Sequence, residues 1–191
     1  MRSTAFFLVF SASLACNAAV ALGYLQAPSA KPAPLILEKE EGERRVWRPI
    51  EGLDSQLALF ILKVDPHNGG SSHLVLGTED VPAGDQIHTH RHPDSDEILF
   101  LQNGQAKVTV GNATREVHGG ATVFIPAGTW ISVRNLGKEA IHAVFVFSNP
   151  GFDEFMRAES VPEGQNVIPL TKAEHSAILA EHAHAVIYQQ P

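Results

Sequence analysis

Three histidines and one glutamate stand close together in this sequence of 191 residues, and their spacing suits a metal site. His88, His90 and His92 alternate with other residues, so on a β-strand their side chains face one side. The Cα atoms of neighbouring histidines are then about 6.5 Å apart. Neutral imidazole nitrogen suits Fe, Mn, Co, Ni, Cu and Zn ions, and a nearby carboxylate adds charge that helps to hold them. Glu97 follows a turn-forming segment, 93–96, and can return on the neighbouring strand to face the histidines. The alternative interpretation is a solvated strand face with three surface histidines.

The segments around these residues have the period of β-strands. Short apolar or alternating stretches are separated by Gly and Asn turns, and they cover residues 57–62, 73–76, 97–101, 106–110, 121–125, 131–133 and 141–147. Regularly spaced short strands predict an all-β sandwich or barrel. Further on, Phe152, Phe155 and Met156 have the spacing of an amphipathic helix, and Thr171 with Glu174 forms a capping box that opens a helix to about His184.

The composition bounds the class of protein. The length fits one globular domain. Fourteen basic against 21 acidic side chains give a formal net charge of −7, which argues against nucleic acid as the main partner. The single cysteine, Cys16, excludes an internal disulfide and a cysteine-based zinc site.

The first 25 residues have the pattern of an export signal. Arg2 precedes an almost continuously apolar stretch, residues 5–25, and Ala19 and Ala21 offer the small side chains of a cleavage site. An uncleaved membrane anchor through residues 5–25 is the main alternative, because about 20 apolar residues can span a bilayer. Either interpretation places the domain outside the cytoplasm, as a secreted, periplasmic or membrane-anchored protein.

Four segments follow from these patterns. Residues 1–21 are expected to be a signal peptide or anchor, and residues 22–55, which are rich in proline and then in charge, an extended arm or linker. Residues 56–150 are expected to form the barrel, and residues 151–191 a helical tail that packs on its outside.

The spacing of glycines, histidines and a proline resembles the two sequence motifs of the cupin superfamily. The first motif is matched by Gly84, His90, His92, Glu97 and Gly104, and the second by Gly120, Pro126, Gly128 and Asn135. The resemblance extends over about residues 56–150. It implies a single cupin β-barrel, of the jelly-roll kind, with short C-terminal helices, and a divalent metal ion (Fe, Mn, Ni or Zn) held inside by His90, His92 and Glu97.

One position departs from the family pattern. Ile131 stands where the second motif carries a histidine that is the fourth metal ligand. The remaining two histidines and one carboxylate are the set expected of non-haem iron oxygenases, so the loss of one ligand does not require the loss of metal. His88 is the candidate that could replace the missing ligand.

The resemblance leaves two function classes open. The first is a metal-dependent enzyme, a dioxygenase, isomerase or lyase that acts on a small organic molecule. The second is a non-catalytic cupin with a degenerate site, which binds a small ligand or a metal. The sequence does not identify catalytic residues, and a homodimer is a further expectation from the resemblance.

Overall fold

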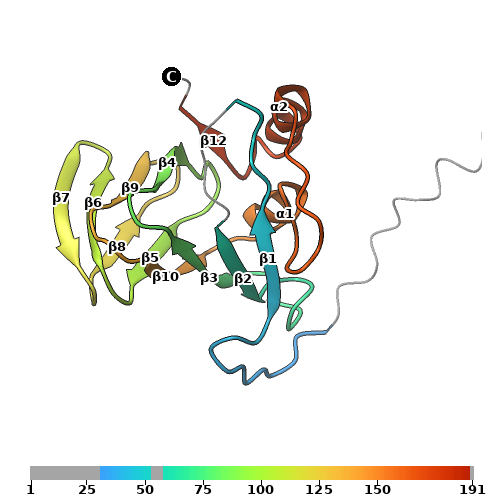
Figure 1. Cartoon of the computed structure of the whole chain (residues 1–191). Helices are drawn as coiled ribbons and strands as arrows, with labels where there is room; N and C mark the ends of the chain where they lie inside the picture. Colours follow the sequence, from blue (N-terminus) through green and yellow to red (C-terminus); the bar gives the residue numbers. More distant parts are fainter. Residues whose placement is uncertain (1–30, 53–57, 190–191) are drawn as a thin grey trace, which may run out of the picture.

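Alternate burial along the strands builds the core. Strands β5 (Glu97–Leu101), β9 (Ile131–Asn135) and β10 (Ile141–Phe147) each bury every second side chain, so each strand turns one apolar face inward. The computed structural model describes residues 31–52 and 58–189, and Figure 1 shows how the strands in these ranges wrap around a common interior. The predicted all-β barrel is confirmed.

Two antiparallel sheets form the walls of the barrel. The larger sheet has the order β11-β1-β2-β3-β10-β5-β8, and its remaining strands are β1 (Glu43–Trp47), β2 (Leu59–Val64), β3 (Val75–Val81), β8 (Thr122–Ile125) and β11 (Ser160–Pro162). The smaller sheet has the order β12-β4-β9-β6-β7, and its remaining strands are β4 (Gln86–Arg91), β6 (Gln105–Val110), β7 (Ala113–His118) and β12 (Ile187–Tyr188).

The two sheets share one apolar core. Both contribute fully buried side chains, among them Phe60, Leu99, Leu101, Ile131, Val133, Phe145 and Phe147. The tight turn before β6 depends on Gly104, whose φ is +82° and whose missing Cβ would lie 2.7 Å from Cγ1 of Ile141. A larger residue there would strain the turn and collide with the core.

Two short helices follow the barrel, as the sequence predicts. Helix α1 (Phe152–Ala158) buries Phe155 and Met156 completely. Helix α2 (Lys172–Glu181) begins with the predicted capping box, in which Thr171 accepts from the Glu174 N–H and the Thr171 N–H donates to the Glu174 carboxylate. It ends three residues before the predicted end. Neither helix in the described ranges has the length and apolar character needed to cross a membrane.

The arm and the tail differ from the prediction. The segment 22–55 was expected to be an extended arm, yet it contains β1, because Trp47 packs its ring 4.7 Å from that of Phe60. The tail 151–191 is not only helical, since β11 and β12 extend the larger and the smaller sheet respectively. These strands have three and two residues, too few to show an alternating pattern. The expected signal peptide, residues 1–21, lies outside the described residues.

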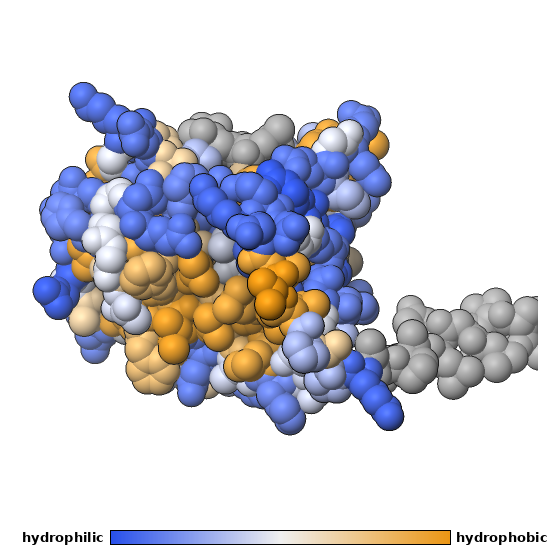
Figure 2. All heavy atoms as spheres, turned by 90° about the horizontal axis from the view of Figure 1, so that it is seen from below, coloured by the Kyte–Doolittle hydropathy of each residue, from blue (hydrophilic) through white to orange (hydrophobic). Residues whose placement is uncertain are grey.

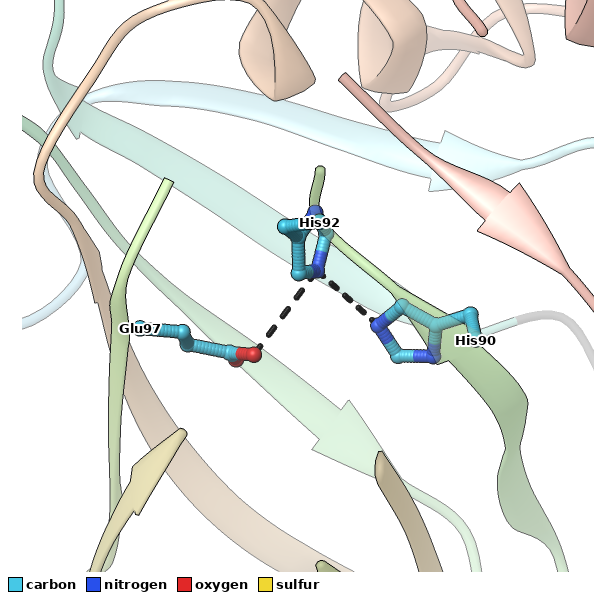
Figure 3. A group of neighbouring side chains, drawn as sticks. All are labelled: His90, His92 and Glu97. Atoms are coloured by element: carbon cyan, nitrogen blue, oxygen red, sulfur yellow. Dashed lines mark hydrogen bonds and ion pairs between the residues drawn. The ribbon is translucent and has the colours of Figure 1, made fainter. Parts of the chain in front are cut away.

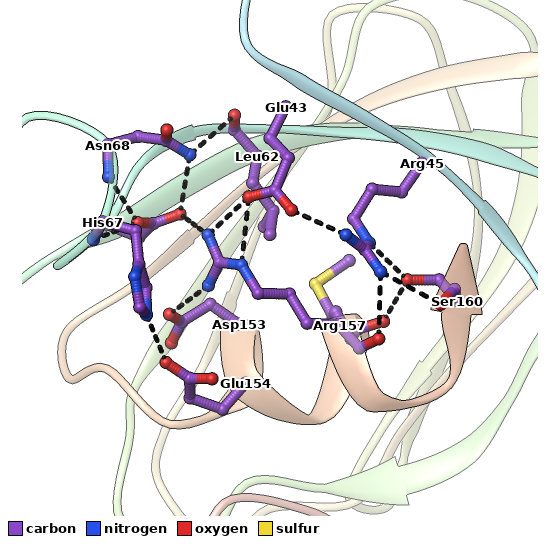
Figure 4. A network of polar contacts seen from close by, with 11 residues as sticks. Glu43, Arg45, Leu62, His67, Asn68, Asp153, Glu154, Arg157 and Ser160 are labelled. Carbon is purple, nitrogen blue, oxygen red and sulfur yellow. Dashed lines mark hydrogen bonds and ion pairs between the residues drawn. The ribbon is translucent and has the colours of Figure 1, made fainter. Parts of the chain in front are cut away.

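A buried ionic network fastens α1 to the barrel (Figure 4). The guanidinium of Arg157 donates to Glu43 on β1 at 2.8 Å, to Asp65 after β2 at 2.6 Å and to Asp153 at 2.9 Å. Asp65 and Asp153 are completely buried, so their charges depend on Arg157 for compensation. The network holds α1 so that Phe152 contacts the ring of His92, with centroids 4.5 Å apart.

Apolar side chains also gather on the outside of the barrel, on the face seen in Figure 2. The large apolar side chains that remain exposed include Ile98 and Phe100 on β5 and Phe124 on the neighbouring strand β8. No neighbouring chain is described on this face, so the expected homodimer stays a prediction.

Candidate metal centre

Strand β4 brings two histidines together inside the barrel. His90 lies on β4 and His92 follows its end, and their side chains are only 5% and 2% exposed. Their Nε2 atoms lie 3.0 Å apart (Figure 3). The sequence predicts this pair from the alternation of residues, and the prediction that they share one face is confirmed for these two.

The hydrogen bonds of the two rings fix where their protons lie. The Nδ1–H of His90 donates to the His88 carbonyl at 2.8 Å, and the Nδ1–H of His92 donates to the Ala185 carbonyl at 2.9 Å. Burial lowers the pKa of His90 to about 4 and that of His92 to about 3, so both rings are neutral at pH 7. Each ring then carries its one proton on Nδ1, and both Nε2 atoms turn a lone pair toward the same point. A cation at that point removes the repulsion between them.

Glu97 supplies a carboxylate from the opposite sheet. It opens β5, and its Oε2 atom lies 3.7 Å from Nε2 of His92. Burial, with a smaller contribution from the charge of Glu79, raises the pKa of Glu97 to about 8. Oε2 is buried and has no hydrogen-bond partner among the described residues. An unpartnered buried carboxylate oxygen is costly, and a metal ion is a partner that would satisfy it.

The three side chains fit a divalent metal ion. Ligand atoms about 2.1 Å from a common ion lie at most about 4.2 Å apart, and the separations of 3.0 Å and 3.7 Å fall within that limit. The third pair, the ligand atoms of His90 and Glu97, lies within 4.8 Å, a bound slightly above that limit. Two neutral imidazoles and one carboxylate suit a transition metal and leave further coordination positions open.

His88 and Ile131 differ in their position relative to the three candidate metal ligands. His88 is exposed and lies at the mouth of the cavity, outside the group of His90, His92 and Glu97. The pairing of β4 with β9 shifts between Ile87 and His90, so the simple alternation that placed His88 beside His90 does not hold. Ile131 is 2% exposed, pairs directly with His90 and lines the cavity, as its place in the second motif implies.

The candidate ligands His90 and Glu97 border a cavity of about 180 Å³. The lining of this cavity includes two residues that the sequence analysis did not identify. Glu79 lies on β3 between the inward-facing Gly77 and Val81, and a charged residue at that position of the alternation was a usable signal. Tyr188 reaches the cavity from β12, where it pairs with His90, with the two rings 5.5 Å apart. Because β12 has only two residues, it shows no alternating pattern by which the sequence could have indicated Tyr188.

Comparison with known proteins identifies the domain. Residues 77–147 match the family model described as a cupin domain. An uncharacterized protein of Methanocaldococcus jannaschii is 35% identical over 58 residues, 30% of this chain and 46% of the relative. The uncharacterized protein YrkC of Bacillus subtilis is 29% identical over 84 residues, 41% of this chain and 45% of the relative. The chain thus spans about half the length of the curated relatives that it matches.

A solved structure supports the same fold. The crystal structure of a predicted oxalate decarboxylase from Thermotoga maritima aligns over 61% of this chain and 100% of its own, with a TM-score of 0.53 and 14% identity. That likeness concerns the fold alone. Together with the family match over β3 to β10, it shows that the two-sheet barrel has the cupin fold and that residues 77–147 belong to a cupin domain.

Proposed function

We propose that the barrel binds one divalent metal ion through His90, His92 and Glu97, and that the metal-loaded protein is an enzyme for a small organic molecule. The observation that carries the proposal is the convergence of two neutral Nε2 atoms, 3.0 Å apart, on a buried carboxylate oxygen without a hydrogen bond. Iron, manganese, nickel and zinc are the candidate ions. A bound ion would supply Lewis acidity or an oxygen-binding centre, which suits dioxygenase, isomerase or lyase chemistry.

The protein's own side chains define what reaches the ion. The cavity of about 180 Å³ opens beside His90 and Glu97, and its wall includes Phe145, Phe147 and Phe152. These aromatic side chains exclude bulk water and offer packing surface to a ring or a short carbon chain. The cavity is smaller than the roughly 300 Å³ at the lower end of drug-sized pockets, so the substrate is small.

Metal analysis of the purified protein tests the first half of the proposal. We expect about one equivalent of metal, and we expect His90→Ala, His92→Ala and Glu97→Gln each to weaken metal affinity by at least about tenfold. His118→Ala is the matched control, because His118 is exposed at the end of the edge strand β7. Equal metal content in the wild type and the three ligand variants would contradict the proposed site.

A non-catalytic binding protein is the second candidate. It is favoured by Ile131, which occupies the place of the usual fourth ligand with a side chain that cannot coordinate. Incubation of the metal-loaded protein with candidate small molecules, followed by mass spectrometry, separates the two functions. An enzyme converts a bound molecule, whereas a binding protein returns it unchanged.

We further propose that the protein is exported. The apolar stretch of residues 5–25 with Ala19 and Ala21 supports this proposal, and it predicts a mature chain that begins near Leu22. N-terminal sequencing of the secreted or periplasmic protein is the test. Intact Met1 in a membrane fraction would replace the cleaved signal with an anchor.

A further inference from the structure

The outer face of the larger sheet is apolar, although it stays exposed in the described part of the chain. A row of paired side chains crosses four strands on this face, and its members are Leu76 on β3, Val146 on β10, Ile98 on β5 and Phe124 on β8. In an antiparallel sheet with one face in solvent, polar side chains alternate with the inward apolar ones. Strands β5, β8 and β10 instead are nearly continuous apolar runs, the pattern of strands that are covered on both faces.

The exposed area of this face is large enough for a specific interface. Phe124, Ile98 and Phe100 are 58%, 44% and 38% exposed. At about 200 Å² for a whole large side chain, these three present about 300 Å². The same face adds the surface of four further side chains, Thr122, Leu76, Val144 and Val146. With these the face presents about 500 Å², so two copies that cover it on each other would bury about 1,000 Å² in total, the size at which an interface becomes specific.

Strand β8, at the border of this face, is the least protected of the four sheet edges. Edge strands are usually kept from pairing with other chains by charged residues, by proline or by shortness. Strand β7 carries Arg115 and Glu116, β11 ends in Pro162, and β12 has only two residues. Strand β8 contains no charged residue and no proline, and it carries Phe124, the most exposed side chain of the apolar row. The part of the face beside this edge is therefore the best suited to contact with another chain.

The charges of the face favour a second copy of this chain over a lipid surface. Its four strands, β3, β5, β8 and β10, contain no lysine or arginine, so they lack the basic residues that attract a protein to an anionic membrane. The exposed Asp96 precedes β5 at the border of the face, and the outward-facing Asp80 is hydrogen-bonded to His142. An uncharged apolar sheet face is complementary to a copy of itself across a two-fold axis, because identical apolar rows then meet. Two such sheets pack about 10 Å apart, as in a β-sandwich.

We propose that two copies of this chain pack the outer faces of their larger sheets against each other across a two-fold axis, with Phe124 and Ile98 at the centre of the interface. The proposal assigns the expected homodimer to one face of the barrel. It is independent of the proposed function, because the candidate metal ligands lie inside the barrel and the interface lies on its outside.

Sedimentation velocity of the purified protein over a range of micromolar concentrations tests the proposal. We expect the mass of two chains for the wild type, and the same mass at high salt, because salt does not screen an apolar interface. Phe124→Glu and Ile98→Glu should each weaken self-association by at least about 100-fold, since the two-fold axis places each new charge in the interface twice. Ile168→Glu is the matched control and should remain a dimer, because Ile168 is 62% exposed but lies between β11 and α2, outside this face.

A wild type that is monomeric at these concentrations would overturn the proposal, as would a dimer that persists in both Phe124→Glu and Ile98→Glu. The second result would assign the association to another surface, such as the apolar stretch of residues 5–25. A thermal melt checks that each variant folds, and Phe124→Ser, a smaller change of the same exposed side chain, replaces a variant that does not. Sedimentation with phosphatidylcholine vesicles tests the other occupant. Vesicle binding by a monomeric wild type that Phe124→Glu abolishes would assign the face to a lipid surface and refute the dimer.

Discussion

Metal affinity should rise steeply with pH between 6 and 8, because the carboxylate that binds the ion must first lose a proton. With a pKa of about 8 for Glu97, about 1% of this side chain is ionised at pH 6 and about half at pH 8. The apparent affinity should therefore increase about fiftyfold over this range. His90 and His92, with pKa values of about 4 and 3, are neutral throughout and add nothing to the slope.

Calorimetry with Zn²⁺ at several pH values, each in two buffers of different ionisation enthalpy, measures both the affinity and the protons released. We expect about 0.9 proton released per ion at pH 7, the protonated fraction of Glu97 there. Glu97→Gln should abolish both the slope and the release. An affinity that is constant from pH 6 to 8, with no proton release, would refute the protonated buried carboxylate on which the reasoning depends.

The same pKa shifts set the stability of the metal-free protein. Glu97 is raised above its unfolded value of 4.5, so its contribution to stability is present below about pH 4.5 and is lost progressively up to about pH 8. The two histidines act in the opposite sense, since their lowered pKa values remove stability as the pH falls below about 6.5. The rise in melting temperature on adding metal should therefore be larger at pH 8 than at pH 6.

Other changes test the surroundings of the site. Ile131→His should tighten metal binding by about tenfold in a chelator competition, because Ile131 pairs with His90 and faces the cavity. Arg157→Ala should cost about 3–5 kcal/mol in denaturant unfolding, since it leaves buried carboxylates uncompensated, whereas Arg44→Ala at an exposed ion pair should cost less than about 1 kcal/mol. A chain that stops after His184 loses the carbonyl that orients His92 and should bind metal about 10- to 100-fold more weakly.

The sequence was sufficient to predict that His90, His92 and Glu97 lie together, because a simple strand period applies to these residues. His90 and His92 are two residues apart, and Glu97 opens the next strand after a turn, so their meeting follows from strand geometry. His88 was placed wrongly beside them, because an irregularity in strand pairing cannot be read from the alternation of residues. Glu79 was missed because the predicted strand, residues 73–76, ends before it, whereas β3 continues to Val81.

The parts of the fold that depend on pairing between residues far apart in the chain could not be predicted from the sequence. Strands β11 and β12 are too short for a period, and each forms only because an edge of an existing sheet offers unpaired backbone groups. For the same reason, the sequence did not predict the role of Ala185, whose carbonyl fixes the tautomer of His92. Such contacts come from the folded barrel as a whole, whereas propensity and period describe neighbouring residues.

The hydrogen bond between His92 and Ala185 also determines the stage of folding at which the site is assembled. It joins residues 93 positions apart, so the ligand is held in its binding orientation only after the segment that follows α2 has been synthesised and has paired with β4. A chain that is still emerging or still unfolded has the ligands but not their arrangement, and metal binding is coupled to the completed fold. A metal ion held by these side chains would therefore be bound only where folding is completed, and not by the unfolded chain.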